Sequence, residues 1–176
     1  MGNSEEVSNP KAAGDATALI STFASKDGVQ RNKARIAIEG IGKPAVPLLI
    51  KALADKKAQV RWEVARALGA IQDPEAGPAL VQALMDVSFE IRWLAAEALI
   101  ALEEKAIVPL LKALMDQSDS VDLRQGAHHV LHALERSHKL NEPTVAVLEA
   151  IRSMESEITI PGAAFDALQS LQGDKK

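Results

Sequence analysis

Val60-Arg61-Trp62 recurs as Ile91-Arg92-Trp93 thirty-one residues further along the chain. The residues that follow recur as well, because Ala65-Arg66-Ala67-Leu68 corresponds to Ala96-Glu97-Ala98-Leu99 at the same spacing. A fixed period of about 31 residues, without Gly- or Pro-rich spacers between the copies, is typical of stacked supersecondary units. We therefore expect a stack of repeated units.

Helical periodicity and turn residues divide the chain into helix pairs. The pattern predicts five pairs, at residues 15–42, 43–72, 73–103, 104–136 and 142–173. In the last pair the helices are expected at 143–154 and 160–171, with Pro161 at the position that arginine holds in the other units. Residues 1–14 show no periodicity and are expected to form a disordered tail.

The amino-acid composition favours helices. Among 176 residues there are three Phe, two Trp and no Tyr, so Ala and Leu supply most of the apolar side chains. Ala and Leu suit close-packed helices better than sheets. We expect an all-α fold with one repeat domain, an α-solenoid or superhelix of about five helix pairs.

Two units share a signature of an aspartate, then Val-Arg or Ile-Arg, then an alanine-rich turn that ends in Leu. The residues are Asp55, Val60-Arg61 and Ala65–Leu68 in the second unit, and Asp86, Ile91-Arg92 and Ala95–Leu99 in the third. This signature resembles the HEAT-like repeat family typified by the phycobilisome lyases, and the resemblance covers most of the chain. It implies HEAT-like repeats but little about activity, because function resides in sites rather than in folds.

An arginine stands at the start of each second helix. These residues are Arg31, Arg61, Arg92 and Arg124, with spacings of 30, 31 and 32 residues. Asp55 and Asp86 each precede an arginine by six residues, within reach of its guanidinium, and an aspartate there can also cap the helix. The resemblance implies that Asp55, Arg61, Asp86, Arg92 and Arg124 form a structural ladder of hydrogen bonds between repeats. The alternative is that Arg61 and Arg92 bind a substrate carboxylate.

Trp62 and Trp93 occupy the same register and are expected to point away from the core. At 100° per residue, Val60, Val64 and Leu68 share the core side of their helix, and Trp62 lies opposite them. Second helices of such solenoids line the concave wall, so the two indoles are expected there as neighbours. Exposed Trp residues in a cluster are typical of an interaction site. The alternative is that each indole fills the groove between repeats.

Extending this register predicts a partner-binding strip on the concave face. Its residues are Trp62, Glu63, Arg66, Trp93, Leu94, Glu97, Gln125 and His129. The strip mixes both charges around apolar surface, which suits a protein or peptide ligand better than nucleic acid. A Trp-bearing groove can also hold a second copy of the chain, so we expect a monomer or a weak homodimer.

His128 and His132 are the candidates for a metal site. Their i,i+4 spacing lets two imidazoles share a metal, but no Asp, Glu or Cys adjoins them in the sequence. HEAT-like metal oxygenases resembling deoxyhypusine hydroxylase carry paired His-Glu dipeptides, which this chain lacks. We therefore predict neither a bound metal nor a cofactor.

Charge and motif content narrow the function further. The formal net charge is −4 without a basic stripe, which argues against nucleic-acid binding. The chain has no cysteine, no signal-like or membrane-length apolar run, and no nucleophile elbow or phosphate loop, so we expect a cytoplasmic, non-catalytic protein. The sequence therefore predicts a scaffold that binds a protein or peptide. The alternative, implied by the resemblance, is a bilin lyase or a chromophore-chaperone-like factor.

Overall fold

The computed structural model describes residues 10–153 and 156–173, and every regular element within these ranges is a helix. The α-helices are α1 (Pro10–Thr22), α2 (Gly28–Ile41), α3 (Val46–Ala52), α4 (Ala58–Ile71), α5 (Gly77–Ala83), α6 (Phe89–Ala101), α7 (Ile107–Asp116), α8 (Val121–Arg136), α9 (Glu142–Arg152) and α10 (Ser156–Gly173). Short 3₁₀ turns, η1 (Lys43–Ala45), η2 (Pro74–Ala76) and η3 (Glu103–Ala106), precede α3, α5 and α7. The chain is an all-α solenoid of helix pairs.

The first helix is longer than the sequence predicts. Helix α1 begins at Pro10, so residues 10–14, which periodicity assigns to a tail, are helical. Pro10 stands at the first helical position, where a missing N–H breaks no hydrogen bond. The remainder of the predicted tail, residues 1–9, lies outside the described residues.

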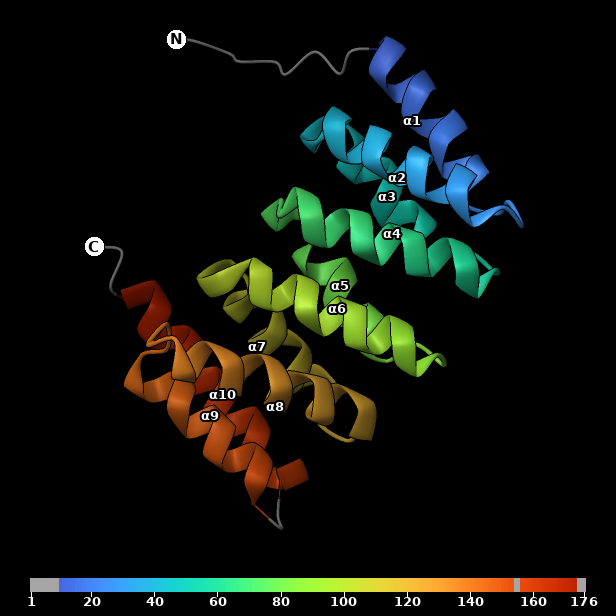
Figure 1. Ribbon diagram of the computed structural model, residues 1–176. Helices are drawn as coiled ribbons and strands as arrows, with labels where there is room; N and C mark the ends of the chain where they lie inside the picture. Colours follow the sequence, from blue (N-terminus) through green and yellow to red (C-terminus); the bar gives the residue numbers. More distant parts are fainter. Residues whose placement is uncertain (1–9, 154–155, 174–176) are drawn as a thin grey trace, which may run out of the picture.

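The helices form two layers. Figure 1 shows α2, α4, α6 and α8 side by side in chain order, with α3, α5 and α7 behind them. The first helices of three repeats start alike: Pro47, Pro78 and Pro109 lie 31 residues apart, each in the first turn of its helix. A proline there sacrifices no hydrogen bond and fixes the backbone angle that a helix requires. The repeat seen in the sequence is therefore a repeat of local geometry.

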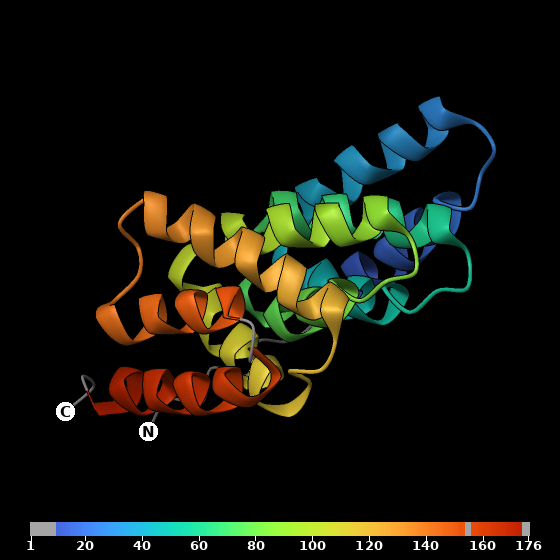
Figure 2. The same cartoon turned by 90° about the horizontal axis from the view of Figure 1, so that it is seen from below.

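The last pair is packed in reverse order. Helix α9 packs against α8, whereas α10 packs against α7 and α9, so the second helix of this pair joins the layer of first helices (Figure 2). Helix α10 also begins at Ser156, earlier than expected, and contains Pro161 in its interior. Pro161 leaves the carbonyl of Glu157 without its helical donor. The Ser118 hydroxyl donates to that carbonyl at 3.1 Å, which ties α10 to the preceding repeat.

One apolar core runs along the solenoid between the two layers. Its largest fully buried side chains come from α2 to α8 and the turn after α1, and include Phe23, Ile38, Leu49, Leu68, Leu80, Leu99, Leu110 and Leu123. Each second helix thus buries one side and leaves the opposite side free of the core. Among the described residues, no helix is both long enough and apolar enough to cross a bilayer.

Candidate partner-binding face

The second helices α2, α4, α6 and α8 present matching triplets of residues on the side opposite the core. The triplets are Val29, Asn32 and Ile36 on α2, Gln59, Trp62 and Arg66 on α4, Glu90, Trp93 and Glu97 on α6, and Asp122, Gln125 and His129 on α8. Each triplet has the spacing i, i+3, i+7, which aligns its members along one helix face. All twelve side chains are exposed or half-buried. We call this surface the second-helix face.

Trp62 lies half-buried between two repeats. The Arg66 guanidinium sits over its ring, 4.7 Å from the centroid, which is a cation–π geometry. The indole also lines a cavity of about 350 Å³ together with Ser88 and Ile91 from the next repeat. Trp62 therefore combines a packing role with a partly open surface.

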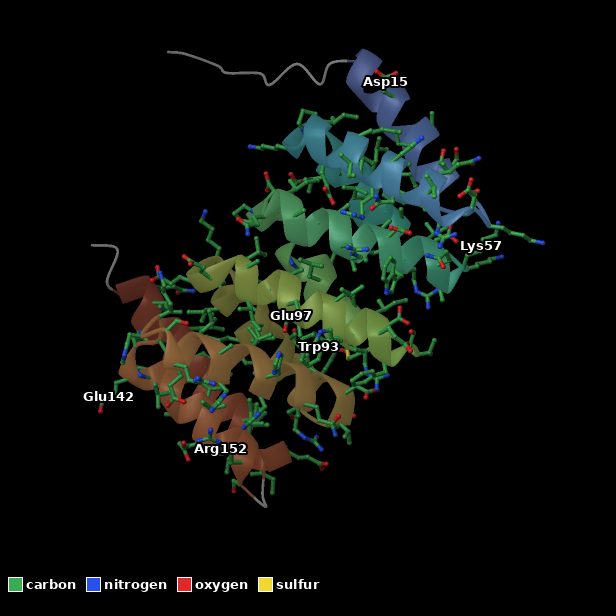
Figure 3. All side chains as sticks on the ribbon, viewed as in Figure 1. Asp15, Lys57, Trp93, Glu97, Glu142 and Arg152 are labelled. Atoms are coloured by element: carbon green, nitrogen blue, oxygen red, sulfur yellow. The ribbon has the colours of Figure 1, made fainter. Side chains whose placement is uncertain are left out.

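Trp93 is the more open of the two indoles, with 48% of the residue exposed. The His129 ring from α8 lies 4.8 Å away, centroid to centroid, at a tilt of 36°. His129 Nε2 is 3.0 Å from Glu97 Oε1, so Trp93, Glu97 and His129 form one cluster between α6 and α8. Figure 3 labels Trp93 and Glu97 on α6. Among the described residues the two indoles form no ring pair with each other. The triplet on α6 is thus joined to the triplet on α8.

A small cavity opens beside Trp93. It has a volume of about 180 Å³ and is lined by Leu84, Phe89, Arg92, Trp93, Ala96, Asp122, Gln125, Gly126 and His129. Gly126 lets α8 approach Leu84, because a Cβ atom at this position would lie 2.8 Å from Leu84 Cδ2. Pockets for small-molecule ligands usually span about 300–1,000 Å³. A cavity of this size suits one side chain of a partner.

Glu63 does not belong to the exposed strip in which the sequence analysis places it. It is only 3% exposed, because Oε1 accepts a hydrogen bond from Arg31 Nε at 3.0 Å and Oε2 lies 3.7 Å from Arg35 Nε. Its side chain faces the preceding repeat rather than the open side. Leu94 holds the same register on α6 and is half-buried, and Gly126 holds it on α8. At this position Glu63 and Gly126 therefore contact the preceding repeat, through Arg31 and Leu84 respectively.

The four arginines each make the same pair of contacts. Nη1 donates to the backbone carbonyl six residues earlier: Arg31 to Ser25 at 2.8 Å, Arg61 to Asp55 at 2.8 Å, Arg92 to Asp86 at 2.9 Å and Arg124 to Ser118 at 2.5 Å. The guanidinium then pairs with an acid of the next repeat: Arg31 with Glu63 at 3.0 Å, Arg61 with Asp86 at 2.6 Å, Arg92 with Asp122 at 3.4 Å and Arg124 with Glu157 at 3.6 Å. The acidic partner changes from repeat to repeat, but the arginine does not.

Arg61 and Asp86 form the tightest of these contacts. Arg61 Nε and Nη2 donate to the two Asp86 oxygens at 2.6 and 2.9 Å, a bidentate geometry that strengthens the pair. Hydrogen bonding to Asp86 raises the pKa of Arg61. Burial disfavours the charged form of Asp86, but the bonds from Arg61 and the Ser88 amide outweigh it and lower the pKa of Asp86 below its ordinary value. Both groups stay charged.

Asp55 occupies the place of Asp86 in the preceding repeat but makes fewer contacts. Its Oδ1 accepts the Lys57 amide at 2.7 Å, as Asp86 Oδ1 accepts the Ser88 amide at 2.8 Å. Arg61 reaches the backbone carbonyl of Asp55 rather than its carboxylate. The aspartates thus order the start of the following helix.

His128 and His132 stack with parallel rings, 5.9 Å apart at 7°. His128 Nε2 accepts a hydrogen bond from Arg152 Nε on α9 at 3.3 Å. Burial, with help from the Arg152 charge, lowers the pKa of His128. Among the described residues, no group of three or more His, Cys, Asp or Glu side chains could hold a metal ion. His128 joins α8 to α9.

Sequence reasoning overlooked Glu90, Asp122 and Phe89. Glu90 and Asp122 hold the same register, 32 residues apart, and lie one turn before Trp93 and Gln125 on their helices. Phe89 lines the cavity beside Trp93 and is 63% exposed. Aligning the repeats at every helix position, rather than only at the two tryptophans, would have placed these residues on the same face.

Residues 16–100 match the family model of HEAT repeats. The structure resembles that of the complex of CpcE and CpcF of phycocyanin lyase from Nostoc sp. PCC7120, with a TM-score of 0.58 and 24% identity over 88% of this chain and 98% of that one. It also resembles an engineered protein, with a TM-score of 0.43 and 20% identity over 88% of this chain and 78% of that one. The sequence matches none of the curated proteins with which it was compared. The fold is that of a HEAT-repeat scaffold.

Proposed function

We propose that this HEAT-repeat scaffold is non-catalytic and binds a protein or peptide partner on its second-helix face, around Trp62 and Trp93. The observation that carries the proposal is the exposed indole of Trp93 beside a cavity that fits one side chain. Large aromatic residues next to small pockets are enriched among residues that dominate binding energy. Trp93 is also prearranged by His129, which lowers the entropy lost on binding.

The chemistry of the face favours a polypeptide ligand. Arg66, Gln125 and His129 offer hydrogen-bonding groups around the indoles, and the rest of the face is apolar, neutral polar or acidic. A nucleic-acid site would need a basic surface, because phosphate contacts dominate such binding. Partner-binding residues in this proposal are Trp62, Arg66, Trp93, Leu94, Glu97, Gln125 and His129.

A peptide-display selection tests the proposal. The wild-type chain is used as bait for a random peptide library, and the double variant Trp62→Ala/Trp93→Ala is used as the parallel bait. We expect peptides that bind the wild type and lose affinity by about 10-fold or more for the double variant, because burying an indole contributes roughly 2 kcal/mol or more. Circular dichroism and thermal unfolding show whether the double variant stays folded.

The contrary result is equally clear. If the double variant chiefly unfolds, the indoles act in packing between repeats. If it folds normally and retains every selected peptide, the binding surface lies elsewhere on the solenoid. The single variants separate the half-buried Trp62 from the exposed Trp93, and we expect Trp93→Ala to lower the melting temperature less.

The likeness to a phycocyanin lyase structure leaves the alternative of a bilin lyase or chromophore-chaperone-like factor. Titration of the chain with a linear tetrapyrrole tests it, because a bound chromophore shifts its absorbance. A saturable shift that Trp62→Ala/Trp93→Ala leaves intact would favour this alternative over peptide binding on the second-helix face.

A further inference from the structure

The second-helix face is divided by charge. Its α6 and α8 triplets carry three carboxylates, Glu90, Glu97 and Asp122, and no lysine or arginine. Its α2 and α4 triplets carry Arg66 and no carboxylate. Charge of one sign concentrated around a binding site selects partners of the other sign and accelerates their approach. The half of the face that contains Trp93 is therefore the acidic half.

The carboxylates flank Trp93 on both sides. Glu90 lies three residues before it and Glu97 four residues after it, so all three share one face of α6. Glu90 accepts the Ser88 hydroxyl at 2.7 Å, which lowers the pKa of Glu90 and keeps it charged. Arg92 also lines the cavity, but its guanidinium is engaged: it donates to the Asp86 carbonyl, pairs with Asp122 and lies 5.7 Å from the centroid of the Phe89 ring.

Exposed apolar side chains stand at or just before the starts of α6 and α8. Val87 is 93% exposed, Phe89 63% and Val121 56%, and Phe89 and Val121 hold the same register at the starts of α6 and α8. Phe89 also lines the 180 Å³ cavity beside Trp93. Exposed apolar clusters of this kind mark interaction sites on soluble proteins. The site thus offers one side-chain-sized cavity lined in part by Phe89 and Trp93, with the exposed carboxylates Glu90 and Glu97 on the same helix.

We propose that the partner segment carries one bulky apolar side chain flanked by lysine or arginine residues. The apolar side chain enters the cavity between α6 and α8, and the basic residues contact Glu90 and Glu97 beside it, because Asp122 already pairs with Arg92. A lysine or arginine stem can also lie across the free part of the Trp93 ring. This inference rests on the proposed function and specifies the chemistry of the partner.

Three fluorescein-labelled synthetic peptides test the inference by fluorescence anisotropy. The first has the sequence Gly-Lys-Lys-Leu-Lys-Lys-Gly, the second replaces every Lys by Glu, and the third replaces Leu by Ser. We expect the first probe to bind, the Glu probe not to bind, and the Ser probe to bind about 10-fold more weakly, because it loses the buried side chain. Added salt should lower the affinity for the first peptide, because the carboxylates that it contacts are exposed to solvent.

Matched charge variants of the protein locate the contact. Glu90→Gln/Glu97→Gln removes two carboxylates beside Trp93, whereas Glu75→Gln/Asp166→Asn removes two exposed carboxylates elsewhere. We expect the first variant to bind the Lys-containing first peptide about fivefold more weakly, because each exposed ion pair contributes up to about 1 kcal/mol. The second variant should bind this peptide as tightly as the wild type does. Thermal unfolding of both variants checks that the fold is intact.

The outcomes separate this inference from the proposed function. If peptides bind in a Trp93-dependent manner but the Glu probe binds as tightly as the Lys probe, the proposed function stands and the inference fails. If no probe binds and the display selection yields no Trp-dependent peptide, both fail. Sedimentation that shows a homodimer sensitive to Glu90→Gln/Glu97→Gln would identify a second copy as the occupant and overturn the inference.

Discussion

At the scale of single residues, the arginine that opens each second helix links neighbouring repeats. Arg61 contacts the backbone of its own repeat through the Asp55 carbonyl and the next repeat through Asp86. The Arg61 and Asp86 side chains are only 12% and 9% exposed, so the pair is more strongly shielded from water than a surface ion pair. The contact therefore joins one repeat to the next.

Asp86→Ala should destabilise the chain more than Asp55→Ala. Both changes remove a hydrogen bond to the amide two residues later, but only Asp86→Ala leaves Arg61 without its carboxylate. We expect a loss of about 2–3 kcal/mol in the free energy of unfolding for Asp86→Ala and about 1 kcal/mol for Asp55→Ala. Urea titration of both variants measures the difference, and equal losses would show that the ion pair contributes nothing.

The contribution of Asp86 should depend on pH in the acid range. Because its pKa is lowered in the folded chain, its stabilisation is complete above the ordinary carboxyl pKa and disappears as the pH falls through the lowered value. The difference in the free energy of unfolding between wild type and Asp86→Ala should therefore disappear on acidification. A gap that stays constant down to about pH 2 would contradict the assigned role.

His128 should make the chain less stable as the pH falls through the ordinary histidine value. Its lowered pKa means that the unfolded chain takes up a proton more readily than the folded chain, so acid favours unfolding in this window. Protonation would also set His128 against Arg152, whose Nε donates to it. We expect the stability of His128→Gln to vary less between about pH 8 and pH 5 than that of wild type. Identical profiles would contradict this account.

At the scale of elements, close approach of neighbouring helices depends on small residues. Gly126 on α8 faces Leu84, and a Cβ atom there would come within 2.8 Å of Leu84 Cδ2. Gly162 also lies inside a helix, α10, but a Cβ atom added there would meet no atom within 4 Å. The two glycines therefore test packing and helix propensity separately.

Gly126→Ala should lower stability, and Gly162→Ala should raise it. Overpacking against Leu84 costs about 1–3 kcal/mol, which exceeds the gain of about 1 kcal/mol from replacing glycine inside a helix. Gly162→Ala should show the gain in helix stability without overpacking, because a Cβ atom there meets no other atom within 4 Å. Thermal unfolding distinguishes the variants, and stabilisation by both would show that α8 can move away from Leu84 at no cost. Because Gly126 lines the cavity beside Trp93, Gly126→Ala should also weaken peptide binding.

At the scale of the whole molecule, the sequence predicts the first four repeats far better than the packing of the last helix pair. Period, proline positions and apolar spacing all report on local geometry, so the helix pairs between residues 28 and 136 follow from them. The reversed order of α9 and α10 depends on long-range packing after the loop that contains His138, and local patterns do not encode it. Pro161 stands near the start of the helix expected at 160–171, but α10 begins earlier, at Ser156. The Ser118 contact to the Glu157 carbonyl accommodates the proline inside α10.

The candidate site follows from the sequence only in part. Helical register places Trp62, Trp93 and His129 on the second-helix face, because one repeat predicts the next. Register alone misplaced Glu63, since it ignores the side of the helix that faces the preceding repeat, where Arg31 lies. The stacking of His129 on Trp93 and the adjacent cavity arise from contacts between helices, so they required the structure.

Nuclear magnetic resonance of the two indole groups tests the central claim most directly. The chain contains two tryptophans, so a ¹⁵N-labelled sample shows two indole N–H resonances, which Trp62→Phe and Trp93→Phe assign. On titration with a peptide from the display selection, we predict that both resonances shift and saturate together, with the larger shift at Trp93. A peptide that binds while both indole resonances stay unchanged would contradict a partner site on the second-helix face.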